Sequence, residues 1–119
     1  MNLSDLQALA EQITVPHRHL QYILEQIKLY VPDATVWAFG SRIKGSHRPA
    51  SDLDLAVLCD KETAKKQLPK LNDIFVESDI PFKVQLLDFN RLPANMQKNI
   101  KKNFVVLYQP KENINKGTF

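Results

Sequence analysis

Apolar residues recur at three- and four-residue spacing along the first quarter of the chain, and this is the period of an amphipathic helix. Residues 3–13 form a short stretch of this kind. Thr14, Val15 and Pro16 then resemble a helix start, because a capping hydroxyl and a proline in the first turn are typical of one. The pattern predicts a second helix that ends before Pro32 and packs on a sheet. Its apolar positions are Leu20, Ile23, Leu24, Ile27, Tyr30 and Val31.

Four short apolar runs bounded by turn residues predict strands after that helix. Residues 34–39 are rich in β-branched and aromatic side chains and end at Gly40. Residues 52–58 form the second run, residues 82–89 the third and residues 104–108 the fourth. The segment between the first two runs contains glycine, serine and proline, which favours a short helical turn that enters a loop.

Two further helices are predicted between the later strands. Residues 61–77 are mostly helical in pattern, and Pro69 is expected to start a new helix or to kink a continuous one, because proline has no amide hydrogen to donate. Residues 94–102 form the other helix. The predicted fold class is α/β (α+β), a small mixed sheet with helices packed mainly on one face. One domain is expected over residues 1–110, followed by a polar, flexible tail at 111–119.

Length and charge limit the classes of function. A chain of 119 residues allows one compact domain with one hydrophobic core. The formal net charge is +3, spread over scattered lysines, so anionic ligands are favoured weakly. No apolar run approaches the roughly 20 residues of a membrane span, and the polar start lacks the regions of a secretion signal. We therefore expect a cytoplasmic protein, with its single cysteine, Cys59, as a buried thiol without a role.

Two acidic residues on the second predicted strand are candidates for metal binding. Side chains alternate along a strand, so Asp52 and Asp54 point to one face while Leu53 and Leu55 point to the other. Their Cα atoms would lie about 6.6 Å apart, and carboxylate oxygens at that separation can converge on a hard cation such as Mg²⁺. An isolated pair of this kind would more often mark the solvated face of an edge strand.

The turn after the first strand changes that balance. Gly40 and Ser41 lie where a strand ends and a helical turn begins, and backbone amides at such a point attract phosphate, which glycine allows to approach closely. Ser41 adds a hydroxyl donor, and Arg42 and Lys44 add positive charge. Alone, Gly40 would indicate a strand-terminating turn equally well. Together with the acids, the turn favours metal-assisted chemistry on a nucleoside triphosphate.

Gly-Ser followed after ten residues by Asp-X-Asp resembles the signature of the DNA polymerase β-type nucleotidyltransferase superfamily. The similarity covers roughly residues 20–108 and is greatest to the minimal nucleotidyltransferase (MNT) domains that are encoded beside HEPN-domain partners. The matching runs are Val36–Arg42, Ser51–Val57 and Lys83–Asp88.

This resemblance implies a function and a set of site residues. Gly40, Ser41 and Arg42 would bind the nucleotide, and Asp52 and Asp54 would hold Mg²⁺ or Mn²⁺. The implied reaction is transfer of AMP from ATP to a hydroxyl, which in members paired with a HEPN ribonuclease toxin is a tyrosine of the toxin. The transfer silences the toxin, so this chain would be an antitoxin in a hetero-oligomer with a HEPN-domain protein encoded nearby.

The third family motif departs from the usual pattern. The family has an acidic residue on the neighbouring strand, where this chain has Gln85. An amide carbonyl is a weak metal ligand and cannot accept a proton at neutral pH. Asp88 could replace the acid if a bulge turned it round, but in a regular strand it lies on the opposite face, ending the strand and capping the next turn. We therefore expect a slow or impaired transferase.

Two other classes of function remain open. In one, the chain keeps the transferase fold without activity and neutralises its partner by occlusion in a stable complex, which the missing acid favours. In the other, the chain is a subunit of a transferase that acts on a small molecule such as an aminoglycoside. Enzymes of that kind usually carry a second, substrate-binding domain, so this alternative ranks last.

The histidines give weaker signals. His17 and His19 are two residues apart on a helix and cannot face each other, so we expect surface residues rather than a metal site. His47 lies between the two motifs and could touch a phosphate or the acceptor, although a solvated loop histidine is the more frequent case.

Aromatic and basic residues outside the motifs indicate structure rather than ligand binding. Trp37 and Phe39 share one face of a strand, which is more typical of core than of a platform for base stacking. The lysines within 98–102 lie near the end of a predicted helix, where they complement its dipole. No direct nucleic acid binding is expected.

Overall fold

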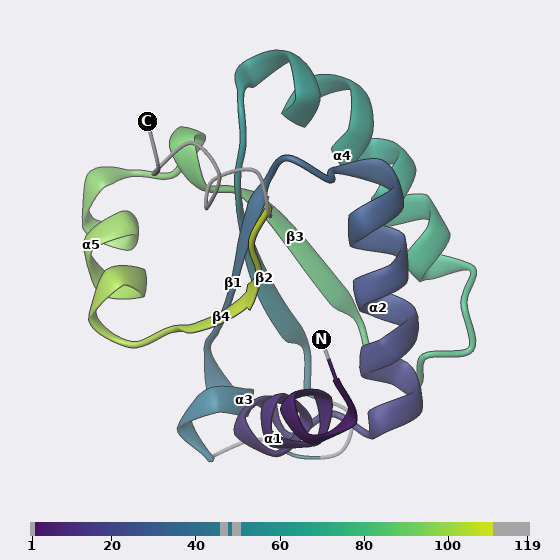
Figure 1. The fold of residues 1–119 in the computed structure, drawn as a ribbon. Helices are drawn as coiled ribbons and strands as arrows, with labels where there is room; N and C mark the ends of the chain where they lie inside the picture. Colours follow the sequence, from purple (N-terminus) through teal and green to yellow (C-terminus); the bar gives the residue numbers. More distant parts are fainter. Residues whose placement is uncertain (1, 46–47, 49–50, 111–119) are drawn as a thin grey trace, which may run out of the picture.

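The computed structural model describes residues 2–45, 48 and 51–110, so the predicted tail at 111–119 and His47 lie outside the described residues. Four strands form one sheet in the order β3-β2-β1-β4 (Figure 1). The strands are β1 (Thr35–Phe39), β2 (Leu53–Leu58), β3 (Val84–Asp88) and β4 (Val105–Tyr108). The helices are α1 (Leu3–Ile13), α2 (His17–Tyr30), α3 (Ser41–Lys44), α4 (Lys61–Val76) and α5 (Ala94–Lys102), and a 3-10 helix spans Phe89–Arg91.

The sheet is mixed, as the sequence predicts. β1 pairs antiparallel with β2 and with β4, while β2 and β3 run parallel. The hairpin-like step from β1 to β2 encloses α3, whereas the parallel step from β2 to β3 passes through α4. As a result, the end of β1 and the starts of β2 and β3 meet at one end of the sheet, close to α3 (Figure 1).

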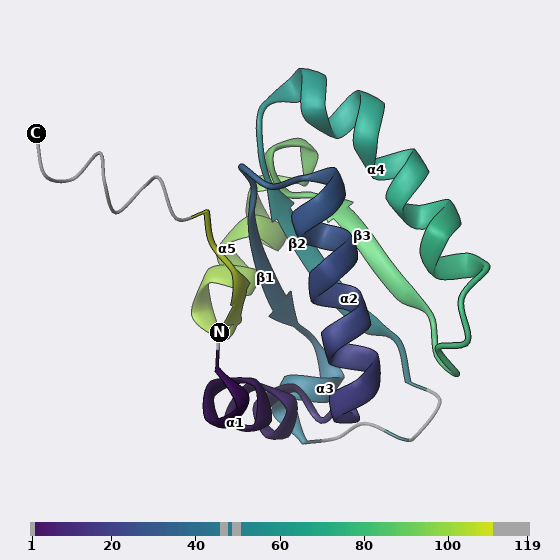
Figure 2. The same ribbon diagram turned by 45° about the vertical axis from the view of Figure 1, so that its right-hand side comes forward.

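Helices cover the two faces of the sheet unequally. α2 and α4 lie against one face, and α5 lies on the other (Figures 1 and 2). The larger core forms between the sheet and the α1, α2 and α4 layer, where alternate residues of each strand point. A smaller cluster beneath α5 contains Ala56, Phe89 and Ile100, with Trp37 and Phe39 packed at its side. This packing agrees with the structural role expected of Trp37 and Phe39.

The connection between α1 and α2 differs from the prediction. Thr14 does not cap α2 but ends α1, in a left-handed conformation with φ 54° and ψ 53°. Its amide donates to Ala10 and Glu11, and its hydroxyl donates to the carbonyl of Arg42 at 3.1 Å. Pro16 takes the cap position of α2. A hydroxyl residue shortly before a proline is typical of a helix start, but here the Thr14 hydroxyl binds the carbonyl of Arg42, a partner that the local pattern does not reveal.

α4 is one continuous helix that contains Pro69, so no new helix begins there. Asp60 caps its first turn by accepting from the amide of Thr63 at 2.7 Å. Pro69 itself is exposed, while Leu71 and Phe75 face the core. Tertiary packing on both sides of the proline therefore outweighs its local preference to interrupt the helix.

His19 also differs from the prediction, because its side chain is buried rather than on the surface. Its ring lies edge-on to Phe82, with centroids 6.2 Å apart. Burial first, and the charge of Arg18 second, lower the pKa of His19. His17 is exposed, as expected. None of the helices that the structure describes combines the length and the hydropathy of a membrane span.

Candidate functional site

The turn between β1 and α3 brings Gly40 against an acidic side chain. Gly40 has φ 87° and ψ −157°, a region that is nearly exclusive to glycine. A Cβ atom at this position would lie 2.5 Å from Oδ2 of Asp54, a distance that side chains do not tolerate. Both the backbone conformation and the contact therefore require glycine. Ser41 follows as the first residue of α3 and is half-buried.

The two predicted metal ligands lie together at the start of β2. Asp52 is exposed and directly precedes the strand, which begins one residue later than predicted. Asp54 is half-buried and pairs with Phe39 on β1, next to Gly40. Burial first, and the charge of Asp52 second, raise the pKa of Asp54, while Lys83 opposes the shift. The two acids are thus separated by one residue at the end of the sheet where Gly40 lies.

Gln85, which the sequence predicts at the third position of the site, lies on β3. It pairs with Asp54 across the parallel β2–β3 ladder. Residues paired across a ladder point to the same face, so Gln85 and Asp54 lie side by side on the α5 side of the sheet. The ladder runs without a shift in register from Leu53 to Val57, so the bulge that could have turned Asp88 toward the site is absent from β3.

Asp88 points away from the site. It pairs with Val57 and lines a cavity of about 730 Å³ beneath α4, on the opposite face of the sheet. Asp88 ends β3 as expected, but its side chain does not cap the following 3-10 helix. One of its carboxylate oxygens, Oδ1, is buried and has no hydrogen-bond partner among the described residues. Asp88 therefore does not replace the missing acid.

The chemistry of the clustered side chains fits a divalent cation. A pair of neighbouring carboxylates, one of them with a raised pKa, gains stability when a cation neutralises them. Gln85 can add an amide oxygen as a ligand. Because Gly40 has no Cβ atom, the carboxylate of Asp54 has room to lie against it. In the described part of the chain no group of three or more acidic, histidine or cysteine side chains is arranged for a metal, so the site has two carboxylates rather than three.

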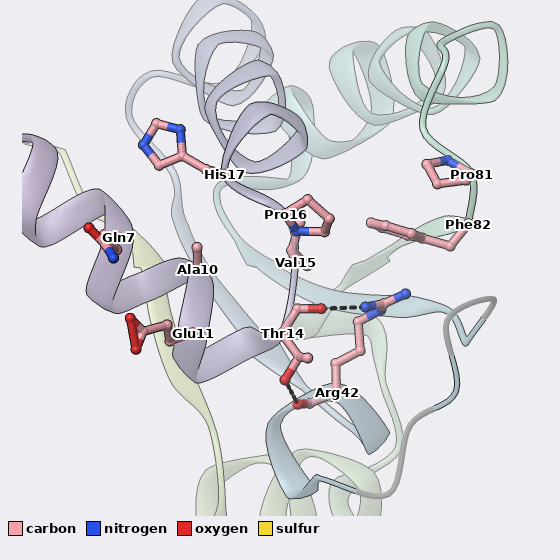
Figure 3. A pocket seen from close by; sticks show the side chains of 10 residues that line it. All are labelled: Gln7, Ala10, Glu11, Thr14, Val15, Pro16, His17, Arg42, Pro81 and Phe82. Atoms are coloured by element: carbon pink, nitrogen blue, oxygen red, sulfur yellow. Dashed lines mark hydrogen bonds between the residues drawn. The ribbon is translucent and has the colours of Figure 1, made fainter.

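Arg42 follows the Gly40–Ser41 turn, and its side chain extends toward Thr14 and Phe82 (Figure 3). Its guanidinium group is buried, with 3% of the residue exposed. Nε donates to the carbonyl of Ser51 at 3.0 Å, and Nη1 donates to the carbonyl of Thr14. The guanidinium carbon lies 4.0 Å from the centre of the Phe82 ring. The phosphate contact expected of Arg42 stays a prediction, whereas these backbone contacts are observed.

Arg42 also forms one wall of a cavity of about 690 Å³ between the α1–α2 connection and the approach to β3 (Figure 3). Pro16, Pro81 and Phe82 supply apolar surface, and Glu11 and His17 lie at its other side. Gly40, Asp52, Asp54 and Gln85 are not among the residues that line it. The cavity therefore adjoins the acidic cluster through Arg42 without belonging to it.

Sequence reasoning missed two residues that support the site, Thr14 and Phe82. Both lie outside the family motifs and contact Arg42 from distant parts of the chain. Arg42 belongs to the first motif, but the neighbouring sequence does not indicate which carbonyls or rings its side chain contacts. The signal that could have pointed to Phe82 is its place just before the third motif, after Pro81.

A small mixed sheet with a glycine turn beside paired acids has the architecture of a nucleotidyltransferase. Residues 22–113 match the family described as "Polymerase beta, Nucleotidyltransferase", and the chain belongs to this family. It is 35% identical over 107 residues to the Probable protein adenylyltransferase MntA of Haemophilus influenzae (strain ATCC 51907 / DSM 11121 / KW20 / Rd). That alignment covers 90% of this chain and 94% of the relative.

Solved structures share the fold. The crystal structure of a toxin-antitoxin with AMP-PNP has a TM-score of 0.54 and 21% identity, covering 79% of this chain and 76% of that one. A putative nucleotidyltransferase has a TM-score of 0.51 and 25% identity, covering 76% and 98%. An MNT antitoxin in complex with the tri-AMPylated HEPN toxin of Shewanella oneidensis has a TM-score of 0.50 and 19% identity, covering 82% and 76%. The family and fold that the sequence motifs implied are thereby confirmed.

Proposed function

We propose that this chain transfers AMP from ATP to a hydroxyl of a HEPN-type toxin, with Mg²⁺ or Mn²⁺, and so acts as an antitoxin. The observation that carries the proposal is the contact of the Gly40 turn with Asp54, beside Asp52. The relative described as a probable protein adenylyltransferase supports it, as do solved relatives described with AMP-PNP and with an AMPylated HEPN toxin.

Each site residue has a defined task in this proposal. Asp52 and Asp54 hold the divalent cation, since carboxylate oxygens are the ligands that Mg²⁺ and Mn²⁺ prefer. The Gly40–Ser41 turn orients the β- and γ-phosphates through backbone amides and the Ser41 hydroxyl. The cation, when bound, would neutralise the charge of the phosphates and polarise their oxygens.

The transfer exchanges a phosphoanhydride bond of ATP for a phosphate ester bond to the acceptor. The acceptor hydroxyl oxygen bonds to the α-phosphorus of ATP, the bond from that phosphorus to the bridging oxygen breaks, and pyrophosphate leaves. The hydroxyl proton must pass to a base. Gln85 stands where a carboxylate could accept it, and its amide cannot. Since a positioned base contributes roughly 10²- to 10⁴-fold, we expect transfer that is slower by such a factor than in a Gln85→Asp variant.

The test is to incubate the purified chain with the proposed HEPN-type partner, ATP and Mg²⁺, and to weigh that partner by mass spectrometry. We expect a mass gain of one or more AMP groups, faster with Gln85→Asp and absent with Asp52→Asn/Asp54→Asn. No gain with the wild type and with Gln85→Asp would refute the enzymatic proposal. A gain that persists in the double variant would refute the site.

Gln85 also favours a second candidate function, in which the chain inhibits its partner by occlusion without transfer. This candidate predicts a partner of unchanged mass, inhibited at a stoichiometric ratio and active again once the chain is removed. Inhibition that persists after removal of the chain would exclude occlusion and support covalent modification.

A further inference from the structure

One buried side chain, that of Arg42, contacts the chain just ahead of two of the three site positions. Ser51, whose carbonyl accepts from Nε, directly precedes Asp52. Phe82, whose ring lies under the guanidinium group, is three residues ahead of Gln85. Arg42 itself follows the Gly40–Ser41 turn. The guanidinium group thus joins the segments that carry the glycine turn, the first acid and the amide.

A second set of contacts anchors Arg42 to the α1–α2 connection. Nη1 donates to the carbonyl of Thr14, and the Thr14 hydroxyl donates back to the carbonyl of Arg42 (Figure 3). This reciprocal pair links residues 28 positions apart in the chain. Thr14 is itself fixed, because its amide donates to the last turn of α1. The α1–α2 connection therefore anchors both the side chain and the backbone of Arg42.

The buried position of Arg42 limits what else it can do. A charged group with 3% of its residue exposed is tolerated because hydrogen bonds and a ring face replace water. Moving the guanidinium to a phosphate would break the bonds to Ser51 and Thr14 and leave those carbonyls to find water. The planar fork matches two carbonyls in fixed directions, which a lysine cannot reproduce.

We propose that Arg42 is a positioning residue that holds Asp52 beside Asp54 through the Ser51 carbonyl and the Phe82 ring, and that it does not bind phosphate. The proposal rests on the proposed function for the identity of the metal ligands. It reassigns the arginine of the glycine turn from the nucleotide to the backbone of the metal site.

Two roles of Arg42, positioning of Asp52 and action as a nearby positive charge, predict changes of opposite sign in the affinity for Mn²⁺ when Arg42 is replaced by alanine. If Arg42 acts through position, both Arg42→Ala and Arg42→Lys weaken Mn²⁺ binding in the absence of nucleotide, by roughly 10- to 100-fold, the range for residues that orient metal ligands. If Arg42 acts as a nearby positive charge, Arg42→Ala removes repulsion and tightens Mn²⁺ binding, while Arg42→Lys leaves it unchanged.

Titration calorimetry of the full chain with Mn²⁺ alone measures this difference. Arg18→Ala is the matched control, because it removes an exposed arginine of α2 and is expected to leave Mn²⁺ affinity unchanged. Weakened binding in both Arg42 variants supports positioning. Tightened binding in Arg42→Ala, or unchanged binding in Arg42→Lys, overturns it.

A measurement without metal separates this inference from the proposed function. The amide of Leu53 donates to the carbonyl of Lys83 at 2.9 Å, one residue beyond Asp52. We expect Arg42→Lys to speed hydrogen exchange of this amide about 10-fold in metal-free protein, with the amide of Ile100 in α5 unaffected. Unchanged exchange at Leu53 overturns positioning even if the wild type binds Mn²⁺. A wild type that binds no Mn²⁺ refutes the metal site, and the Leu53 exchange rate then decides the role of Arg42.

Discussion

At the scale of single residues, the surroundings of Asp54 disfavour the charged form of its side chain. Burial and the neighbouring Asp52 raise its pKa above the ordinary value of 3.8. The folded protein therefore binds this proton more tightly than the unfolded chain does. Stability from this group is present below the unfolded pKa and falls as the pH rises toward the folded pKa, above which the loss is complete.

Asp54→Asn is therefore expected to be more stable than the wild type at neutral pH without divalent cations. The difference in stability between the variant and the wild type should shrink as the pH falls through the folded pKa of Asp54, because the Asp54 side chain of the wild type then becomes neutral as well. Urea unfolding between acidic and neutral pH in the presence of a chelator measures this, and Mn²⁺ should stabilise the wild type but not the variant. A stability difference that is the same at every pH would contradict the assignment.

Gly40 and Gly45 form a natural pair of test positions. Both have positive φ, but an added Cβ meets Asp54 at Gly40, whereas at Gly45 it finds no atom of the described residues within 4 Å. We expect Gly40→Ala to lower the free energy of unfolding by about 2 kcal/mol and to weaken Mn²⁺ binding, because backbone strain and displacement of Asp54 add together. Gly45→Ala should cost about 1 kcal/mol from backbone strain alone, without a change in Mn²⁺ affinity.

Chemical denaturation and Mn²⁺ titration of the two glycine variants separate strain from contact. Equal Mn²⁺ affinities in Gly40→Ala and Gly45→Ala would show that the Gly40 turn does not act on Asp54. That outcome would remove the observation on which the proposed function rests.

At the scale of elements, α4 carries a proline that its packing tolerates. Pro69 lies in the ninth position of a 16-residue helix and is exposed, so its side chain contributes little burial. We expect Pro69→Ala to raise the free energy of unfolding by about 1 to 2 kcal/mol, because roughly 3 kcal/mol of helix penalty is relieved while the unfolded chain gains entropy. Lys70→Ala, at the next exposed position, serves as the control and should change stability by less than about 0.5 kcal/mol in urea unfolding.

A loss of stability in Pro69→Ala would indicate that α4 depends on the geometry that proline imposes. The geometry that proline imposes on α4 would then also shape the cavity that Pro69 lines beneath the helix.

At the scale of the whole molecule, α2 packs against the sheet and contributes to the larger core. Ile27 is fully buried in the core, whereas Leu29, two residues on in the same helix, is 69% exposed. Ile27→Ala should lower the free energy of unfolding by about 2 to 5 kcal/mol, because it removes buried methyl groups and leaves a cavity. Leu29→Ala should change it by less than about 0.5 kcal/mol. Similar losses in urea unfolding for both variants would mean that α2 is covered on both sides.

The sequence by itself determined the local elements and the chemistry of the motifs. Periodicity located the helices and strands within a few residues, because burying one face of an element imposes a repeat of apolar positions. The Gly-Ser and Asp-X-Asp spacing indicated the family, which the comparisons confirm. Where prediction failed, at Thr14 and His19, a partner distant in the chain outweighed local preference.

Tertiary structure alone decided how the motif residues meet. The parallel pairing of β2 and β3 places Gln85, not Asp88, beside Asp54, because a register is set by the whole sheet. The same holds for Arg42, whose position in a motif suggested a phosphate ligand and whose observed partners include two carbonyls and a ring. A sequence fixes which groups a side chain carries, whereas the packing of distant segments fixes which groups it can reach.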